Sequence, residues 1–217
     1  MTPFYIYYLS LIAIGAFLAC FSYKKGNRQS GILALLLALT FVKELLTYHI
    51  PNDKNWIFYI ITDGFNILEY TLFCMYYLRT CSPNKLKRWI KLSILLFAVF
   101  GLYTSIFIYR FATFPALNID VEGLLLFLIY THLLFNLDVD EKRFIYMHPD
   151  FWISIGVLVF FGGIFAVVGL LPVIIWLNTA LTQAEYILIF AVLNTILYNS
   201  IIIGLIWSIR QKKYSIV

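Results

Sequence analysis

The stretch GILALLLALTFVKELLTYHI, residues 31–50, decides how the whole chain must fold. No charge occurs in it until Lys43 and Glu44, which stand side by side before apolar residues resume. A helix that crosses a bilayer needs about 20 largely apolar residues, so the uncharged run is too short to span a membrane alone. The charged pair is therefore predicted to lie inside a spanning helix, where charges face the protein interior and find partners.

The composition supports this interpretation. Of the 217 residues, 62% are hydrophobic and only 12% are charged, and the mean hydropathy is +0.87. Soluble domains carry roughly 25% charged residues, so a chain this apolar needs the lipid bilayer as its solvent. The net charge of +5 is spread over short basic clusters that form no continuous face, so we expect no nucleic-acid partner.

Seven apolar runs are long enough to cross a bilayer as helices. Loop-forming residues separate them, and the longest intervening segment, about 138–150, is short. The sequence thus predicts an all-α integral membrane protein, a seven-transmembrane helix bundle that forms a single domain over residues 1–217, without a water-soluble catalytic domain. The predicted helices span about 4–23, 30–50, 56–80, 89–111, 119–137, 151–176 and 183–209.

Loop charges predict the orientation. With seven crossings, every Lys and Arg except Lys43, Lys54 and Arg110 falls in or beside loops on one side of the membrane. Positively charged loops stay in the cytoplasm, so we expect the N-terminus outside and the C-terminus in the cytoplasm. Lysines follow the first apolar run instead of preceding it, which argues against a cleaved signal peptide. We expect a multi-pass protein of the cell's inner (plasma) membrane.

Lys43 has a candidate partner in the next predicted helix. The second and third helices turn about Asp53, and Lys43 and Asp63 lie at equal distances along the chain from that turn. In an antiparallel pair of helices they are level, so the sequence predicts a structural ion pair between them. Such a pair either fastens two helices together or belongs to a switch. Glu44 points about 100° away from Lys43 and is expected to face another helix.

A second, deeper tier of polar residues is predicted near the middle of the membrane. Glu69, His132 and Asn194 lie well inside their predicted helices, and Asn66 is one turn from both Asp63 and Glu69. Ionisable residues at such depth mark functional sites by default, and hydrogen bonding between packed helices is the alternative for each. The predicted ligand-binding or switch residues are Glu44, Asp63, Asn66, Glu69, Glu122, His132 and Asn194.

Motifs for metals, cofactors and catalysis are absent from the sequence. The three cysteines fit no metal-binding spacing, and His49 and His148 fall on opposite sides of the predicted membrane, so no three-histidine site can form. The last apolar run contains no lysine for a retinal Schiff base, and no HExxH, GxSxG or CxxC motif occurs. We therefore expect no metal and no cofactor, and the sequence identifies no catalytic residue.

The start of the sixth predicted helix carries the pattern P-x-FW-x-S-x-G-x-L-x-(Y/F)F-x-G. It is formed here by Pro149, Phe151, Trp152, Ser154, Gly156, Leu158, Phe160, Phe161 and Gly163. In this pattern, and in LNTILYNSIIIGLIW of the last helix, the chain resembles an uncharacterised family of seven-helix bacterial membrane proteins. It also resembles the seven-transmembrane input regions of sensor histidine kinases. The resemblance implies a seven-helix fold, it provides no catalytic residue that could be carried over to this chain, and we expect no output domain after Val217.

The sequence leaves several classes of function open. The first is a stand-alone, receptor-like sensor that binds a small ligand or a proton in its polar interior and signals to a separate cytoplasmic partner. The second is a small proton-linked transporter that uses Asp63, Glu69 and His132 as its path, although no internal repeat is evident. The third is an intramembrane enzyme on lipid-like substrates, for which there is no motif. An accessory subunit is the last.

Overall fold

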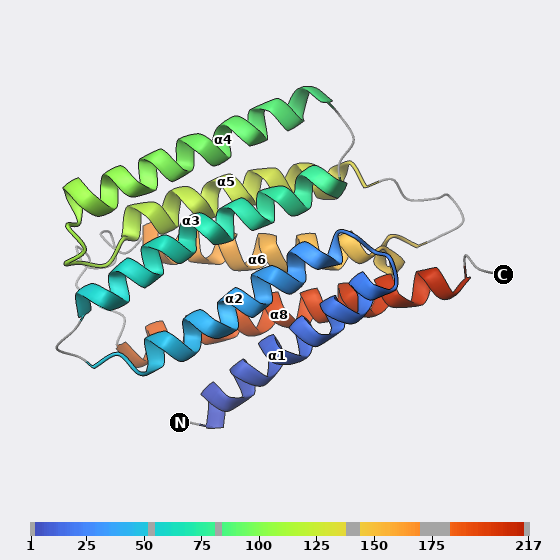
Figure 1. Ribbon diagram of the computed structural model, residues 1–217, viewed down its shortest axis with the longest axis horizontal. Coiled ribbons are helices and arrows are strands. Elements are labelled where there is room, and N and C mark those ends of the chain that lie inside the picture. Colours follow the sequence, from blue (N-terminus) through green and yellow to red (C-terminus); the bar gives the residue numbers. More distant parts are fainter. Residues whose placement is uncertain (1–2, 52–54, 81–83, 138–143, 170–182, 215–217) are drawn as a thin grey trace. The chain divides into compact units, whose positions relative to one another are not determined.

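The structure, a computed structural model, describes residues 3–51, 55–80, 84–137, 144–169 and 183–214. Figure 1 shows that these residues form long helices, and no strand occurs within the described ranges. The elements are α1 (Pro3–Lys24), α2 (Ser30–Tyr48), α3 (Asn55–Thr80), α4 (Asn84–Tyr103), the π-helical turn η2 (Thr104–Ile108), α5 (Ala116–Phe135), the short 3₁₀ turn η3 (Ile145–Met147), α6 (Pro149–Gly169) and α8 (Gln183–Tyr214).

Each of the seven predicted apolar runs overlaps one of the long helices, although several helices begin or end outside the predicted bounds, as α4 does at Asn84. In the described part of the chain, seven helices are long and apolar enough to cross a membrane. The prediction of an all-α fold with seven long apolar helices is therefore confirmed, except that residues 170–176 of the sixth predicted helix lie outside the described residues. The orientation of the termini across the membrane stays a prediction.

The chain divides into two compact units. The first, residues 12–118, holds the later part of α1, α2, α3, α4 and η2, and it ends in the first turn of α5. We call it the α3 unit. The second, residues 1–11 and 119–217, holds the start of α1, most of α5, and α6 and α8. We call it the α6 unit. The prediction of a single domain stays a prediction.

In the α3 unit, α3 packs against α2 on one side and against α4 on another (Figure 1). The contact with α4 is aromatic and polar. The ring of Tyr70 lies 4.4 Å from that of Phe97, and its hydroxyl donates to the Ser93 hydroxyl over 2.9 Å. Tyr70 is fully buried, so its hydroxyl needs such a partner. The two contact sides of α3 decide which neighbours its polar residues meet.

The connection from α1 to α2 is a tight, hydrogen-bonded turn. Gly26 adopts a left-handed backbone conformation with φ 89°, and its N–H donates to the Tyr23 carbonyl over 2.8 Å. A glycine in this conformation is the usual end of a helix. The hydroxyls of Ser22 and Ser30 then join α1 to α2 over 2.8 Å. The predicted break between the first two helices is therefore confirmed at this glycine.

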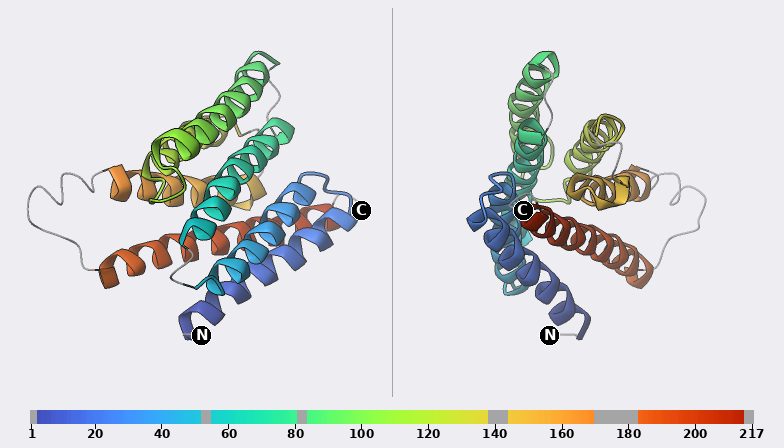
Figure 2. Two further views of the ribbon diagram at one scale, coloured as in Figure 1. Left: turned by 60° about the vertical axis from the view of Figure 1, so that its left-hand side comes forward. Right: turned by 90° about the vertical axis from the view of Figure 1, so that its right-hand side faces the viewer.

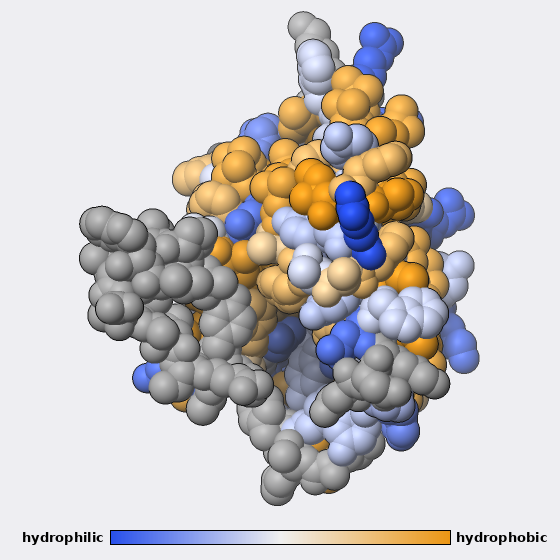
Figure 3. All heavy atoms as spheres, turned by 90° about the vertical axis from the view of Figure 1, so that its left-hand side faces the viewer, coloured by the Kyte–Doolittle hydropathy of each residue, from blue (hydrophilic) through white to orange (hydrophobic). Residues whose placement is uncertain are grey.

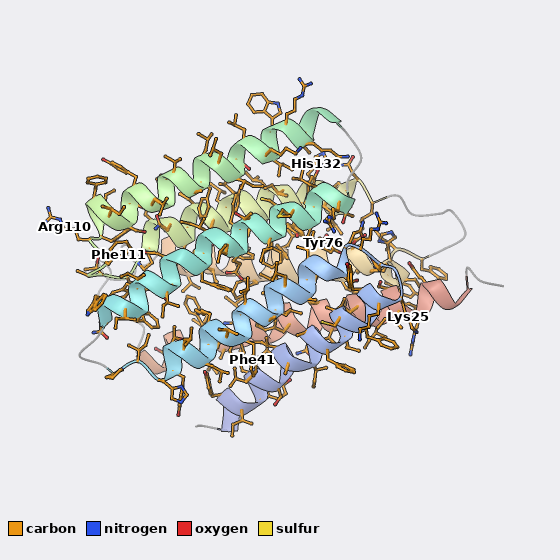
Figure 4. The ribbon with its side chains drawn as sticks, in the orientation of Figure 1. Lys25, Phe41, Tyr76, Arg110, Phe111 and His132 are labelled. Atoms are coloured by element: carbon orange, nitrogen blue, oxygen red, sulfur yellow. The ribbon has the colours of Figure 1, made fainter. Side chains whose placement is uncertain are left out.

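The end of α4 departs from the expected α-helix. Residues Thr104–Ile108 form a π-helical turn, and the N–H of Tyr109 closes it by donating to the carbonyl of the residue five positions earlier over 2.8 Å. Arg110 and Phe111, at the end of the helix in Figure 4, have φ values of 49° and 54°. A left-handed conformation in two successive non-glycine residues is strained, and π-helical turns and strained backbone occur often at functional sites.

The start of α5 was predicted too late. The helix begins at Ala116, directly after Pro115, rather than at residue 119. Pro cannot continue a helix from the preceding residue, but it leaves the chain well placed to begin one. The side-chain hydroxyl of Tyr109 accepts the N–H of Leu117 over 2.9 Å, which satisfies a donor that the first turn leaves open. The early start brings Asn118 into the helix.

In the α6 unit, α6 (orange) and α8 (red) are neighbours (Figure 2). Glycines allow their backbones to approach closely. A Cβ atom at Gly204 would lie 2.8 Å from the carbonyl oxygen of Pro149, and one at Gly156 would lie 2.7 Å from the Cβ of Ser200. Neither position has room for a larger residue. Pro149, Gly156 and Gly163 of the P-x-FW-x-S-x-G-x-L-x-(Y/F)F-x-G pattern therefore contribute to the packing surface against α8, because a Cβ atom at Gly163 would lie 2.6 Å from Leu193 of that helix.

Large apolar side chains cover the outside of the helices. Phe17, Leu95, Phe107 and Leu188 each expose between 62% and 71% of their surface. Apolar residues, coloured orange, also cover much of the coloured part of the face shown in Figure 3. Exposed apolar surface on this scale is unsuited to water and suits lipid chains. Together with the seven candidate spans, it marks the chain as a multi-pass membrane protein.

Candidate functional site

The most polar part of the α3 unit is a buried cluster around Asp63. Asp63 and Asn66 lie one turn apart on α3, Thr104 and Ser105 begin η2, and Asn118 lies in the first turn of α5. Each of these five side chains belongs to a residue that exposes 7% of its surface or less. We call these residues the Asp63 cluster. It combines one carboxyl group with two amides and two hydroxyls, and no cation is part of it.

Asn118 is the centre of the hydrogen bonds in this cluster. Its Nδ2 donates to Asp63 Oδ1 over 3.5 Å and to Ser105 Oγ over 3.3 Å. Its Oδ1 accepts from the Thr104 hydroxyl, which also lies 2.9 Å from the carbonyl oxygen of Gly101. A single amide thus ties the first residues of η2 to the carboxyl group on α3.

Two buried atoms of the Asp63 cluster lack a hydrogen-bond partner among the described residues. They are Asp63 Oδ2, an acceptor, and Asn66 Nδ2, a donor. Buried polar atoms are almost always satisfied, so an unsatisfied pair requires an explanation. Because Asp63 and Asn66 are neighbours on one helix face, a single small ligand with a donor and an acceptor could satisfy both atoms.

The predicted ion pair between Lys43 and Asp63 is not formed. Lys43 Nζ instead lies 2.8 Å from Oε1 of Glu44, its neighbour in the chain, and 5.6 Å from the ring centre of Phe65. Asp63 accepts from Asn118 instead. The two long side chains of Lys43 and Glu44 converge even though their Cα–Cβ bonds point about 100° apart.

Lys43 and Asp63 do not pair because Asp63 lies on the side of α3 that faces away from α2. At 100° per residue, Asp63 and Phe65 point about 160° apart around the helix axis. Lys43 on α2 reaches Phe65, so that side of α3 faces α2. Asp63 is therefore turned towards the end of α4 and the start of α5. Counting residues from the turn gives the distance along a helix and does not give the direction in which a side chain points.

Glu69 belongs with the Lys43–Glu44 pair. It lies four residues after Phe65, on the same side of α3, and it is within electrostatic reach of both Lys43 and Glu44. Lys43 on α2 is therefore a cation within electrostatic reach of this buried carboxyl group. Glu44, Glu69 and Lys43 thus form a second charged group in the α3 unit, on the opposite side of α3 from Asp63.

The remaining predicted site residues lie in the α6 unit. Glu122 is buried in α5, with 2% of its surface exposed. His132 lies in the last turn of α5 rather than well inside it, as Figure 4 shows, because α5 ends at Phe135. Asn194 donates to the carbonyl of Phe190 in its own helix over 2.8 Å. A shared tier of these residues with Glu69 stays a prediction.

Thr104, Ser105 and Asn118 are not among the site residues that the sequence predicts. A signal existed for the first two, since adjacent hydroxyl residues interrupt an otherwise apolar run. Asn118 follows Pro115 closely and was read as part of a loop, whereas a proline just before a helix also predicts its start. The π-helical turn itself leaves no mark on hydropathy, because its residues are as apolar as those of α4.

Comparison with protein-family models, with curated proteins and with solved structures finds no match to the chain. The class of the protein is therefore assigned from its own sequence and structure. It is a multi-pass membrane protein with seven candidate membrane-spanning helices in its described part. No group of three or more metal-binding side chains occurs among the described residues.

Proposed function

We propose that this chain is a receptor-like membrane sensor that binds a small polar ligand or a proton at the Asp63 cluster. The observation that supports it most directly is the pair of unsatisfied atoms, Asp63 Oδ2 and Asn66 Nδ2, in a deeply buried group of polar side chains. A ligand with an N–H or O–H group would donate to the carboxyl oxygen, and its acceptor would take the amide N–H. A proton on Asp63 would instead remove the charge of the buried carboxylate and leave the Asn66 amide unsatisfied.

The hydrogen bonds of Asn118 supply a route from ligand to conformation. Its amide N–H groups are divided between Asp63 and Ser105, and both of those bonds are long, at 3.5 and 3.3 Å. A ligand that engages Asp63 frees Asn118 to bond more closely to η2, the π-helical turn. Since η2 leads directly into the strained residues Arg110 and Phe111, we expect binding to reshape the connection between α4 and α5.

The orientation, the type of membrane and the signalling partner in this proposal are inferred from the sequence. The asymmetry of loop charges favours an outer N-terminus and a cytoplasmic C-terminus in the inner (plasma) membrane. The resemblance to seven-helix bacterial proteins and to the input regions of sensor kinases favours a sensor that reports to a separate cytoplasmic partner. That partner would contact the basic residues in the first turns of α4 and in the last turns of α8.

A proton-linked transporter is the second candidate, and one observation favours it. The residues Asp63, Asn66 and Glu69 are spaced by three along α3, so they wind around the helix from the Asp63 cluster to the Lys43–Glu44 pair. Carboxyl groups inside a membrane are among the residues that proton relays use, and this strip has one at each end.

Ligand-dependent stability of the full chain tests the sensor proposal. The purified protein is heated in detergent at neutral and mildly acidic pH, and separately with ammonium chloride and with acetamide as small polar probes. We expect at least one condition to raise the melting temperature of the wild type and not that of Asp63→Asn. Asp120→Asn is the matched control, because Asp120 carries the same carboxyl group but lies on α5, outside the Asp63 cluster. The melting temperature of this variant should respond to the probes as that of the wild type does.

Flux separates the two candidates. A sensor in proteoliposomes leaves an imposed proton gradient unchanged, whereas a transporter dissipates it and loses that activity in Glu69→Gln. If no probe stabilises the wild type, or if Asp63→Asn responds as strongly as the wild type, the Asp63 cluster is not the binding site.

A further inference from the structure

A second feature of the α3 unit lies at the end where α1 and α3 finish and α2 begins. It is a cavity of about 460 Å³ between these three helices. Three of its lining residues are cationic: Lys24, Arg28 and Arg79. The cavity volume falls within the range of about 300–1,000 Å³ typical of small-molecule sites. Lys25, labelled in Figure 4, lies beside this end of α1.

The basic rim of the cavity is held in place. Arg79 Nη1 donates to the carbonyl oxygen of Arg28 over 3.0 Å, and Gln29 Nε2 donates to the carbonyl oxygen of Arg79 over 3.1 Å. These reciprocal bonds fix the turn after α1 against the end of α3. A guanidinium group carries five N–H donors, so the bond to Arg28 leaves Arg79 with donors for an anion.

The charge of the rim is not balanced within the cavity. No acidic residue is among its described lining residues. Arg28 and Arg79 are exposed at the rim, and arginine is the side chain best shaped to bind a phosphate with two parallel hydrogen bonds. The rim therefore fits an anionic group, and a phosphate above all.

Below the rim, the wall of the cavity is apolar. Leu72 and Met75 line it from α3 and Leu35 lines it from α2. Leu72 lies seven residues before Arg79, which places it about 10 Å deeper along the helix at 1.5 Å per residue. Leu35 and Met75 expose 50% and 39% of their surface, so the wall is open on the side where lipid chains would lie. The cavity changes from cationic to apolar along the direction in which a phospholipid changes from headgroup to acyl chain.

We propose that this cavity binds one anionic phospholipid, with its phosphate between Arg28 and Arg79 and the first part of an acyl chain along Leu35 and Leu72. A soluble anion would gain nothing from the apolar wall, and a zwitterionic lipid would bring its own cation to the basic rim. Basic pockets between helices at the cytoplasmic surface are a recognised form of anionic-lipid site, and the loop charges assign this end to the cytoplasm.

Native mass spectrometry of the full chain in detergent tests the proposal, with dioleoylphosphatidylglycerol, dioleoylphosphatidylcholine and inorganic phosphate as probes. We expect one phosphatidylglycerol to stay bound to the wild type and to raise its melting temperature. Phosphatidylcholine and inorganic phosphate should do neither. In the double variant Arg28→Gln/Arg79→Gln, retention of phosphatidylglycerol should fall about tenfold or more.

The matched control removes the same charge elsewhere. Arg88 and Lys91 are exposed residues near the start of α4 and do not line the cavity. Arg88→Gln/Lys91→Gln should keep phosphatidylglycerol retention within about twofold of the wild type. If it loses as much as the cavity variant, lipid is attracted only by diffuse surface charge and the proposal is overturned.

Two more variants cover the case in which the loss of Arg79 harms folding. Lys24→Gln/Arg28→Gln keeps the bond from Arg79 to the backbone of residue 28, and Leu35→Trp fills the cavity while keeping every charge. Both should retain less phosphatidylglycerol than the wild type. Unchanged retention in Leu35→Trp would mean that the lipid lies outside the cavity.

Discussion

The α6–α8 interface and the polar side of α3 show two ways to hold helices together. In the first, glycines bring the backbones of α6 and α8 into contact, at Gly156 and Gly204. In the second, side chains of α3, η2 and α5 meet through hydrogen bonds that converge on Asn118.

The two regions also differ in how their polar groups are satisfied. On α8, Asn194 and Asn199 each donate to a carbonyl of their own helix over 2.8 Å. Such side chains contribute little to contacts between helices. In the Asp63 cluster, by contrast, the bonds cross between elements and two atoms remain unsatisfied among the described residues. The comparison teaches that α6 and α8 are held by close packing, whereas the Asp63 cluster is held by side-chain hydrogen bonds and keeps two atoms unsatisfied among the described residues.

The largest expected effect is at the glycine contact. Gly204→Leu places a side chain where even a Cβ atom would lie 2.8 Å from the Pro149 carbonyl oxygen. The backbone of α6 must move away, so we expect a loss of about 3 kcal/mol in unfolding free energy. Thermal unfolding in detergent should show the melting temperature falling by several degrees per kcal/mol lost.

Gly64 provides the control for that variant. A Cβ atom at Gly64 would meet nothing within 4 Å, and alanine favours a helix over glycine by about 0.5–1 kcal/mol. Gly64→Ala should therefore be neutral or stabilising. Equal destabilisation at both glycines would mean that close packing of α6 against α8 is not the cause.

The second effect concerns the hub of the polar cluster. Asn118→Ala removes the donor to Asp63 and Ser105 and the acceptor of Thr104. Leaving buried polar groups unsatisfied costs about 1–3 kcal/mol, so we expect a loss near 2 kcal/mol, measured by denaturant or thermal unfolding. Leu117→Ala, at the exposed neighbouring position, should cost much less; a similar loss there would contradict the hub role of Asn118.

A third, smaller effect distinguishes the two partners considered for Lys43. A double-mutant cycle of Lys43→Met with Glu44→Gln should give a coupling of about 1 kcal/mol, because their charged atoms lie 2.8 Å apart. The cycle of Lys43→Met with Asp63→Asn should give almost none. Coupling to Asp63 that exceeds coupling to Glu44 would restore the ion pair that the sequence predicted.

The smallest effect is expected on α8. Asn199→Leu removes a hydrogen bond that returns to Thr195 of the same helix, so the change in unfolding free energy should stay within about 0.5 kcal/mol. The same thermal unfolding assay measures it. A loss comparable to that of Asn118→Ala would show that Asn199 also joins helices, and the contrast between the two regions would fail.

The positions of the helices follow from hydropathy and helix-end chemistry. Long apolar runs place the seven helices, Pro149 begins α6 and Gly26 lies in the turn that follows α1. What the sequence could not provide is the side on which each residue meets its neighbours. Lys43 was assigned to Asp63 by distance along the chain, whereas a difference of two residues on α3 turns Phe65 towards α2 and Asp63 away from it.

The candidate site was predicted only in part. Asp63 and Asn66 were identified because a carboxyl group and an amide are costly inside a membrane. The sequence does not identify Thr104 and Ser105, because a hydroxyl group costs little free energy inside a helix. It does not identify Asn118, because the predicted start of α5 lies after that residue. The π-helical turn depends on contacts between elements. A hydropathy average along the chain does not detect such contacts.

The π-helical turn has a mechanical consequence for the loop that follows it. Its wider winding holds more residues per turn than an α-helix does, and releasing one of them would advance the helix end by about 1.5 Å and swing it by about 100°. The Tyr109 hydroxyl would then leave the N–H of Leu117 that it now accepts. The end of α4 would then shift its register by one residue. The exchange of a single hydrogen bond at Asn118 would thereby move the first turn of α5 by one residue.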